Sequence, residues 1–127
     1  MKLLLDTHAF IWWDSDPGQL SAPALAALRD PANVVWFSVV SVWEIVIKNQ
    51  LGKLTLRLPL ADIVAQQQAN GLQVLPVTLP HSLAVEGLPP VHKDPFDRLL
   101  VAQTNIEGTE LISADPIFKQ YPVRLLW

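Results

Sequence analysis

Short runs of apolar residues, separated by polar and turn-forming segments, set the pattern of this chain. The first run, Leu3-Leu4-Leu5, is apolar at consecutive positions and ends at Asp6. A strand that is apolar on both faces is typical of a parallel sheet covered by helices on both sides. Similar runs, rich in β-branched, aromatic or leucine residues, predict four more strands at residues 34–37, 73–77, 110–113 and 123–127.

Segments with helical patterns and helix-capping signals lie between these strands. Helices are predicted at residues 7–13, 21–30, from 39 or 42 to 51, 59–70, 81–86, 95–108 and 117–121. Residues 53–58 alternate between polar and apolar side chains, which predicts an extended edge. Because strands alternate with helices and no repeat is present, the chain is predicted to be an α/β fold with a central, mainly parallel sheet flanked by helices.

Composition narrows the class of protein. Half of the 127 residues are apolar, and we expect residues 1–127 to form a single domain. The absence of cysteine excludes disulfide bridges and thiolate zinc sites. No signal-peptide core and no stretch of about 20 apolar residues is evident, so we expect a soluble, cytoplasmic protein without a membrane anchor. The net charge of −3 gives no general attraction to nucleic acid, although acids gathered around a cation still permit a phosphate substrate.

Four acidic residues occupy related places in the predicted fold. Asp6 and Asp115 follow predicted strands, whereas Glu44 and Asp97 lie near the starts of predicted helices. In a parallel α/β sheet, the carboxyl ends of the strands and the starts of the following helices share one rim, so we expect the four side chains to converge there. Carboxylate oxygens suit Mg²⁺ or Mn²⁺, which can activate water and bind a phosphoryl group.

Each acid also has a purely structural interpretation. Asp6 is placed to cap the helix that follows it. Glu44 completes a Ser-x-x-Glu capping box and is also spaced for an ion pair with Lys48. Asp97 would be stabilised by a helix dipole, and Asp115 would belong to a simple turn. The coincidence of all four at one rim favours a metal site over four unrelated roles.

Four motifs carry these acids in order from the first predicted strand to the last. They are Leu-Leu-Leu-Asp6-Thr-His, Ser-Val-Trp-Glu44-Ile, His-Lys-Asp-Pro-Phe-Asp97-Arg-Leu-Leu-Val-Ala-Gln and Leu-Ile-Ser-Ala-Asp115. Together they resemble the PIN-domain family, and within it the VapC-type toxins of bacterial toxin–antitoxin pairs. The resemblance implies a PIN-like three-layer fold and a Mg²⁺- or Mn²⁺-dependent endoribonuclease. It also implies a small antitoxin protein as the partner that blocks the active site.

By the same resemblance, the catalytic residues are Asp6, Glu44, Asp97 and Asp115. Asp6 and Asp97 would bind the metal directly, and Glu44 and Asp115 would bind it directly or through water. Asp97 is preferred to Asp94 because Asp97 has the family's spacing to the apolar residues that follow it.

Further candidates surround the four acids in the sequence. Lys48, Lys93, Arg98 and Ser113 are candidates for substrate binding, and the cationic side chains, together with His92, are candidates for holding the RNA backbone. Arg98 is equally suited to pairing with an acid inside the fold. Ser113 matches a small hydroxyl position beside the fourth acid, and a plain polar role is favoured for His92. Apolar helices around three tryptophans leave room for a homodimer beside the antitoxin: Trp12, Trp13 and Trp43. Two alternative functions stay open, a catalytically inactive PIN-like module that binds RNA or protein, and a metal-dependent phosphatase.

Overall fold

Five strands form one sheet at the centre of the computed structural model, which describes residues 1–127. The strands are β1 (Lys2–Leu5), β2 (Val34–Ser38), β3 (Gln73–Leu75), β4 (Glu110–Ile112) and β5 (Leu125–Leu126). Their order across the sheet is β3-β2-β1-β4-β5, and every neighbouring pair is parallel. The predicted α/β fold with a mainly parallel sheet is therefore confirmed. The direction of winding reverses between β1 and β4, which makes this the switch point of the sheet.

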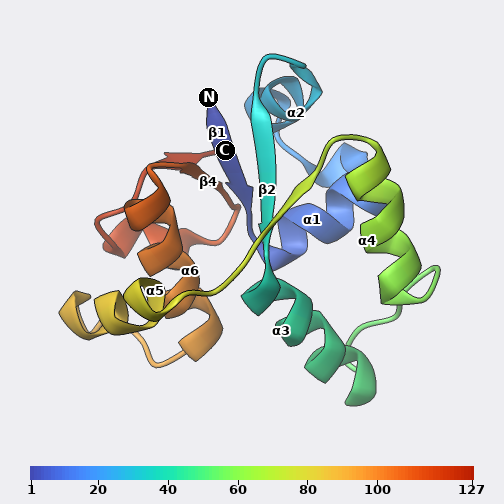
Figure 1. Cartoon of the computed structure of the whole chain (residues 1–127). Coiled ribbons are helices and arrows are strands. Elements are labelled where there is room, and N and C mark those ends of the chain that lie inside the picture. The colour runs from blue at the N-terminus through green and yellow to red at the C-terminus, as the bar shows by residue number, and fades with distance from the viewer.

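Helices cover both faces of the sheet (Figure 1). The α-helices are α1 (Thr7–Ser15), α2 (Ala22–Arg29), α3 (Val39–Gln50), α4 (Leu60–Ala69), α5 (Leu79–Ala84) and α6 (Pro95–Glu107). Short 3₁₀ helices add η1 (Pro17–Gln19), η2 (Val85–Gly87) and η3 (Pro116–Gln120). Helices α1, α2 and α4 lie on one side and α5 and α6 on the other, with α3 at the end where β2 finishes (Figure 1). None of the helices combines the length and apolar character needed to cross a lipid bilayer.

The leucine run of β1 contributes side chains to two separate hydrophobic clusters, one on each face of the sheet. Leu3 and Leu5 belong to the cluster that packs with α1, α2 and α4, whereas Leu4 belongs to the cluster that packs with α6. All three side chains are fully buried, as expected for a central strand covered on both faces. Because β1 is held from both sides, the position of the residue that follows it, Asp6, is well defined.

Capping side chains place the helix starts where the sequence predicts them. Ser21 accepts a hydrogen bond from the backbone N–H of Ala24 and begins α2. Asp94 accepts from the N–H groups of Phe96 and Asp97 and begins α6. Each cap satisfies N–H groups that have no partner within the helix. The start of α6 also fixes the position of Asp97, one of the four acids singled out in the sequence.

The predicted extended edge at residues 53–58 is wrong, because this segment pairs with no strand. Leu54, Leu56 and Leu58 pack against the core on the α1 side, while the side chains between them are exposed. The alternation therefore reflects burial of one side of a loop. Arg57 holds this loop to α1 through two 2.8 Å hydrogen bonds with the Asp14 carboxylate.

Three other boundaries differ from the prediction. Strand β3 ends at Leu75, before Pro76, which has no N–H to continue the ladder. Strand β5 contains only Leu125–Leu126. The helix predicted from residue 81 begins at Leu79 because Thr78 caps it in a capping box with His81.

Candidate active site

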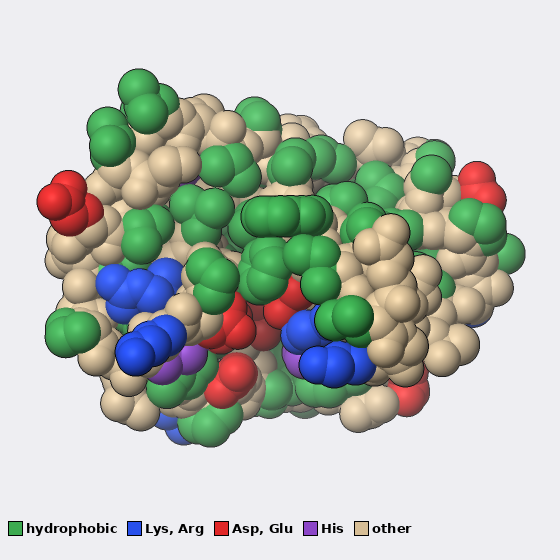
Figure 2. Space-filling model, turned by 90° about the horizontal axis from the view of Figure 1, so that it is seen from below, with side chains coloured by type: hydrophobic (Ala, Val, Ile, Leu, Met, Phe, Trp, Pro, Cys, Tyr) green, Lys and Arg blue, Asp and Glu red, His purple; other side chains and the backbone are tan.

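The four predicted acids meet at the rim where the parallel strands end. Asp6 follows β1, Asp115 lies beyond β4, Glu44 lies in α3 and Asp97 is the third residue of α6. All four line one pocket of about 110 Å³. This pocket spans the switch point between β1 and β4, where open α/β sheets bind ligands. Figure 2 looks onto this rim, with acidic side chains gathered at its centre and basic side chains on two sides.

Asp94 adds a fifth carboxylate to the pocket. Its Oδ1 atom accepts from Phe96 N–H at 2.9 Å and from Asp97 N–H at 3.0 Å, as expected for an aspartate that caps a helix with proline at its first position. The same side chain also lines the pocket, together with Thr7 and the cationic Lys48. Capping and a place in the pocket are therefore compatible for this residue.

Asp6 combines the two roles that the sequence left open. Its side chain accepts from Ala9 N–H at 2.7 Å and caps α1, while the residue lines the pocket with only 7% of its surface exposed. Burial raises the pKa of the Asp6 carboxyl to about 6, against the opposing effect of hydrogen bonds from Ser113 and Ala9. An ionised carboxylate here is held in an unfavourable environment that a bound cation would relieve.

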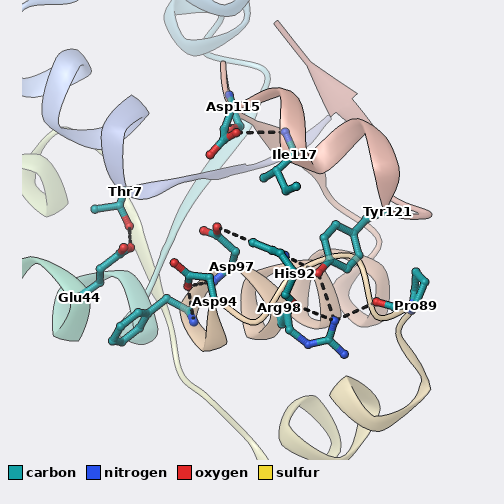
Figure 3. A network of polar contacts seen from close by, with 12 residues as sticks. Thr7, Glu44, Pro89, His92, Asp94, Asp97, Arg98, Asp115, Ile117 and Tyr121 are labelled. Carbon is teal, nitrogen blue, oxygen red and sulfur yellow. Dashed lines mark hydrogen bonds and ion pairs between the residues drawn. The ribbon is translucent and has the colours of Figure 1, made fainter.

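Asp97 is also in an environment that disfavours its charge. Burial raises the pKa of the Asp97 carboxyl, the negative charges of Asp94 and Glu44 act in the same direction, and a hydrogen bond with His92 opposes them. The Oδ2 atom of Asp97 lies 3.0 Å from Nε2 of His92 (Figure 3). This contact is the one hydrogen bond that the Asp97 carboxylate makes within the protein.

Glu44 differs from these two acids because both of its oxygens have partners. Oε1 accepts from the Thr7 hydroxyl, and Oε2 lies 2.8 Å from the Lys48 ammonium (Figure 3 draws the contact with Thr7). The ion pair predicted from the spacing of Glu44 and Lys48 is confirmed. The alternative capping-box role is wrong. A cap at Ser41 would start the helix at Val42, but Ser38 is the cap and α3 starts at Val39, so Ser41 and Glu44 both lie inside the helix. The hydrogen bond with Glu44 is the main cause of a raised pKa for Lys48.

Ser113 connects the acids that follow β1 and β4. Its hydroxyl oxygen accepts from Asp115 N–H at 3.1 Å, and its hydroxyl also hydrogen-bonds the Asp6 carboxylate. Asp115 is exposed, and its Oδ1 accepts from Ile117 N–H at 3.0 Å. Ser113 is buried and lies between the two acids.

Lys93 and Arg98 are not brought to the acid pocket. Both line a separate hollow of about 320 Å³ beside η2. The guanidinium of Arg98 donates to the carbonyl of Pro89 at 2.8 Å and to the hydroxyl of Tyr121 at 3.1 Å. Of the basic residues predicted to bind RNA, Lys48 alone lines the pocket of the acids.

Two residues of this region were missed by the sequence reasoning: Thr7 and Tyr121. Thr7 directly follows Asp6 in the first motif, so its hydroxyl was the available signal. His92 was expected to have a polar role, but its contact with Asp97 was not predicted. Tyr121 has no such signal, because its contact with His92 joins residues 29 positions apart in the chain.

The donor set of the pocket fits a hard divalent cation. Five acidic side chains line the pocket and supply carboxylate oxygens: Asp6, Glu44, Asp94, Asp97 and Asp115. Burial raises the pKa of both Asp6 and Asp97. No three histidine, aspartate or glutamate side chains lie close enough together to coordinate one ion. Mg²⁺ does not require such a cluster, since it keeps several waters and usually binds through one or two carboxylates.

Comparison with known proteins decides the family. The family model described as PIN domain matches residues 3–123. The chain belongs to the PIN-domain family. This PIN domain is 27% identical over 114 residues to Ribonuclease VapC22 of Mycobacterium tuberculosis, an alignment that covers 89% of this chain and 86% of the relative. The resemblance inferred from the four motifs is therefore confirmed.

A solved structure gives independent support for the fold. The crystal structure of VapBC2 from Rickettsia felis, bound to a DNA fragment from their promoter, contains a chain that superposes with a TM-score of 0.64. The match covers 98% of this chain and 96% of that chain, at 15% sequence identity. At this identity the likeness concerns the fold alone.

Proposed function

We propose that this PIN-domain protein is a metal-dependent endoribonuclease and the toxin of a toxin–antitoxin pair. The observation that carries the proposal is the pocket that Asp6, Glu44, Asp97 and Asp115 line at the switch point of the sheet. Membership of the PIN-domain family supports it, as does the name Ribonuclease VapC22 of a relative that aligns with 89% of the chain.

The proposed cofactor is Mg²⁺ or Mn²⁺. Asp6 and Asp97 would hold it, and Glu44 and Asp115 would act directly or through water. When bound, such an ion supplies Lewis-acid stabilisation of a phosphoryl group and lowers the pKa of a water molecule. The free Oδ1 of Asp97 supports this assignment, as does the contrast with Glu44, whose oxygens are both engaged by Thr7 and Lys48.

The chain's own residues would bind and orient the RNA around this centre. Lys48 lines the pocket, and 37% of its side chain is exposed, so its ammonium can reach a backbone phosphate while it remains near Glu44. Lys93 is exposed in the neighbouring hollow and would bind a phosphate further along the strand. Ser113 would keep Asp6 and Asp115 in place.

The proposed protein partners are an antitoxin and a second copy of the chain. Large apolar side chains are exposed on two helices near the acid rim: Trp43 and Val46 of α3, and Leu79 and Leu83 of α5. Exposed apolar surface of this kind is typical of protein interfaces. Light scattering on the purified chain would give a dimer mass if the second copy binds, and a monomer mass would contradict this part of the proposal.

Cleavage of a single-stranded RNA in the presence of Mg²⁺ or Mn²⁺ tests the function. Asp97→Asn removes one carboxylate from the pocket and should abolish cleavage. Asp62→Asn is the matched control, because Asp62 is also the third residue of its helix, is exposed, and lies outside the pocket. Full cleavage by folded Asp97→Asn protein would exclude the assignment.

The same assay separates the two alternative functions. Turnover of a small phosphomonoester without RNA cleavage would indicate a phosphatase. RNA binding without metal-dependent cleavage of any substrate would indicate an inactive binding module. Cleavage by the wild-type chain with products that require an internal cut would support the endoribonuclease.

A further inference from the structure

A series of hydrogen bonds extends from Asp97 away from the acid pocket (Figure 3). Asp97 Oδ2 lies 3.0 Å from His92 Nε2. The other ring nitrogen of His92, Nδ1, lies 2.6 Å from the hydroxyl of Tyr121. That hydroxyl accepts a 3.1 Å hydrogen bond from the guanidinium of Arg98. One side chain of the pocket is therefore connected to three residues that do not line it.

The chemistry of the four groups gives each of these hydrogen bonds a direction. A guanidinium only donates, and an ionised carboxylate only accepts. Nε2 of His92 must therefore carry the hydrogen that is shared with Asp97. If Nδ1 also carried one, the hydroxyl hydrogen of Tyr121 would have no acceptor. Every group is satisfied when Arg98 donates to Tyr121, Tyr121 donates to His92 Nδ1, and His92 Nε2 donates to Asp97.

The segment that carries His92 is fixed by Arg98 and Tyr121. Arg98 donates to the carbonyl of Pro89 at 2.8 Å and is 3.4 Å from the carbonyl of His92 itself. Tyr121 is buried in the core cluster that also contains Leu4, and its ring packs edge-on against the His92 ring at 5.5 Å. The imidazole is thus held in position by the loop that carries it, by α6 and by the residue after η3.

We propose that His92 is a positioning residue that orients the Asp97 carboxylate for a divalent cation, and that Tyr121 and Arg98 hold His92 in its Nε2–H tautomer. The inference rests on the proposed function, since it takes Asp97 as a metal ligand. The hydrogen bond to Oδ2 directs the carboxylate and leaves Oδ1 without a protein donor. Partners of this kind behind a metal ligand are worth about 10–100-fold in metal affinity or activity.

This role differs from the one that the sequence suggests for Arg98. Its guanidinium donates to carbonyls and to the hydroxyl of Tyr121, so binding an RNA phosphate would break contacts that hold the loop. Arg98 therefore acts on the site through Tyr121 and His92, and contact with RNA is not required.

Metal affinity is the first test. Calorimetric titration of Mn²⁺ into the full chain should give a dissociation constant about 10–100-fold weaker for His92→Ala and about tenfold weaker for Tyr121→Phe. His92→Gln, which keeps a donor near the position of Nε2, should recover most of the affinity. His81→Gln is the control, because His81 is buried in a separate hydrogen-bond network with Thr78. It should lower the melting temperature and leave the Mn²⁺ affinity unchanged.

RNA kinetics separate positioning from direct substrate binding. For His92→Ala, we expect an unchanged KM for RNA and a reduced kcat at limiting Mn²⁺, with kcat recovering at saturating Mn²⁺. Unchanged Mn²⁺ affinity with a raised KM would instead make His92 a phosphate ligand. Unchanged Mn²⁺ affinity with a lowered melting temperature would make its role structural. Either result would overturn the inference.

Nitrogen-15 NMR of the metal-free chain tests the tautomer without any metal or RNA. The His92 ring should carry its hydrogen on Nε2, and Tyr121→Phe should remove this preference. A hydrogen on Nδ1 in the wild-type chain would overturn the inference even if the protein cleaves RNA. Failure of the wild-type chain to bind Mn²⁺ or cleave RNA would instead overturn the proposed function, so the two failures are distinguishable.

Discussion

The acids of the pocket form two groups that differ in how their negative charge is compensated. Glu44 is paired with Lys48 at 2.8 Å and accepts from Thr7. Asp6 and Asp97 have no lysine or arginine within ion-pair distance, and burial raises the pKa of both carboxyls. A divalent cation would gain most at Asp6 and Asp97, because there it would neutralise charge that no lysine or arginine of the protein compensates.

The opposite rim of the sheet shows that size alone does not mark the site. A hollow of about 620 Å³ lies near the starts of β2 and β3, lined by polar side chains that include Asn33 and Gln67. Asp30 is the one acid in its lining. The pocket of about 110 Å³ at the other rim has five. Gathered and buried charge, rather than volume, identifies the place where cation chemistry is possible.

The largest expected effect comes from removing the charge of Asp6, which no lysine or arginine compensates. Asp6→Asn should lower metal-dependent RNA cleavage by about 10²–10³-fold, the range for loss of a strong electrostatic contribution to a transition state. The fold should persist, because asparagine caps a helix as well as aspartate does. Asp30→Asn is the control, since Asp30 also accepts a backbone N–H but lies at the opposite rim. Equal cleavage rates for the two variants would remove the distinction between the rims.

The stability of the metal-free protein should depend on the protonation of Asp6. Its pKa is about 6 in the fold and near the ordinary value of 3.8 when unfolded, so between these values the folded state binds more protons. The free energy of unfolding should therefore fall as pH rises from about 4 to 6, by up to about 3 kcal/mol for this group. Urea denaturation across this range, with Asp6→Asn as the control that lacks this contribution, measures the effect. A contribution of opposite sign would contradict the assigned environment of Asp6.

A smaller effect is expected from removing the cation that is paired with Glu44. Lys48→Met leaves Glu44, which is 6% exposed, without a cation and should lower the free energy of unfolding by about 1–2 kcal/mol. Added Mn²⁺ should recover part of this loss. Lys53→Met is the control, because Lys53 is exposed and outside the pocket. Equal stability of the two variants would mean that the Glu44–Lys48 pair compensates no buried charge.

The smallest expected effect concerns the hydroxyl between the acids. Ser113→Ala removes a hydrogen bond that favours the ionised form of Asp6, so the pKa of Asp6 should rise further. We expect a change of about 1 kcal/mol or less in the free energy of unfolding. Carbon-13 NMR titration of the Asp6 carboxyl in the metal-free protein would detect the shift. An unchanged or lowered pKa would mean that Ser113 does not act on Asp6.

The arrangement of the acids was predictable because it depends on local features of the chain. A leucine run that ends in Asp6 predicts a central strand and the position of its last residue. Asp94 followed by Pro95 predicts the start of α6, and with it the place of Asp97. Parallel strands then bring these ends to one rim without any further information.

The details of the site were less predictable because they depend on contacts between distant segments. Glu44 looked like part of a capping box, but Ser38 begins α3 earlier and frees Glu44 to pair with Thr7 and Lys48. The leucine alternation at residues 53–58 resembled a strand because a loop buried on one side has the same pattern. The contact between His92 and Tyr121 exists only once the fold is complete.

We propose that the metal binds at Asp6 and Asp97, the acids that no lysine or arginine compensates. Parallel calorimetric titrations of Mn²⁺ into the wild-type chain, Asp6→Asn and Glu44→Gln test it most directly. We expect no measurable binding for Asp6→Asn, and for Glu44→Gln a dissociation constant within about tenfold of the wild type. Wild-type affinity in Asp6→Asn, or complete loss of binding in Glu44→Gln alone, would contradict the claim.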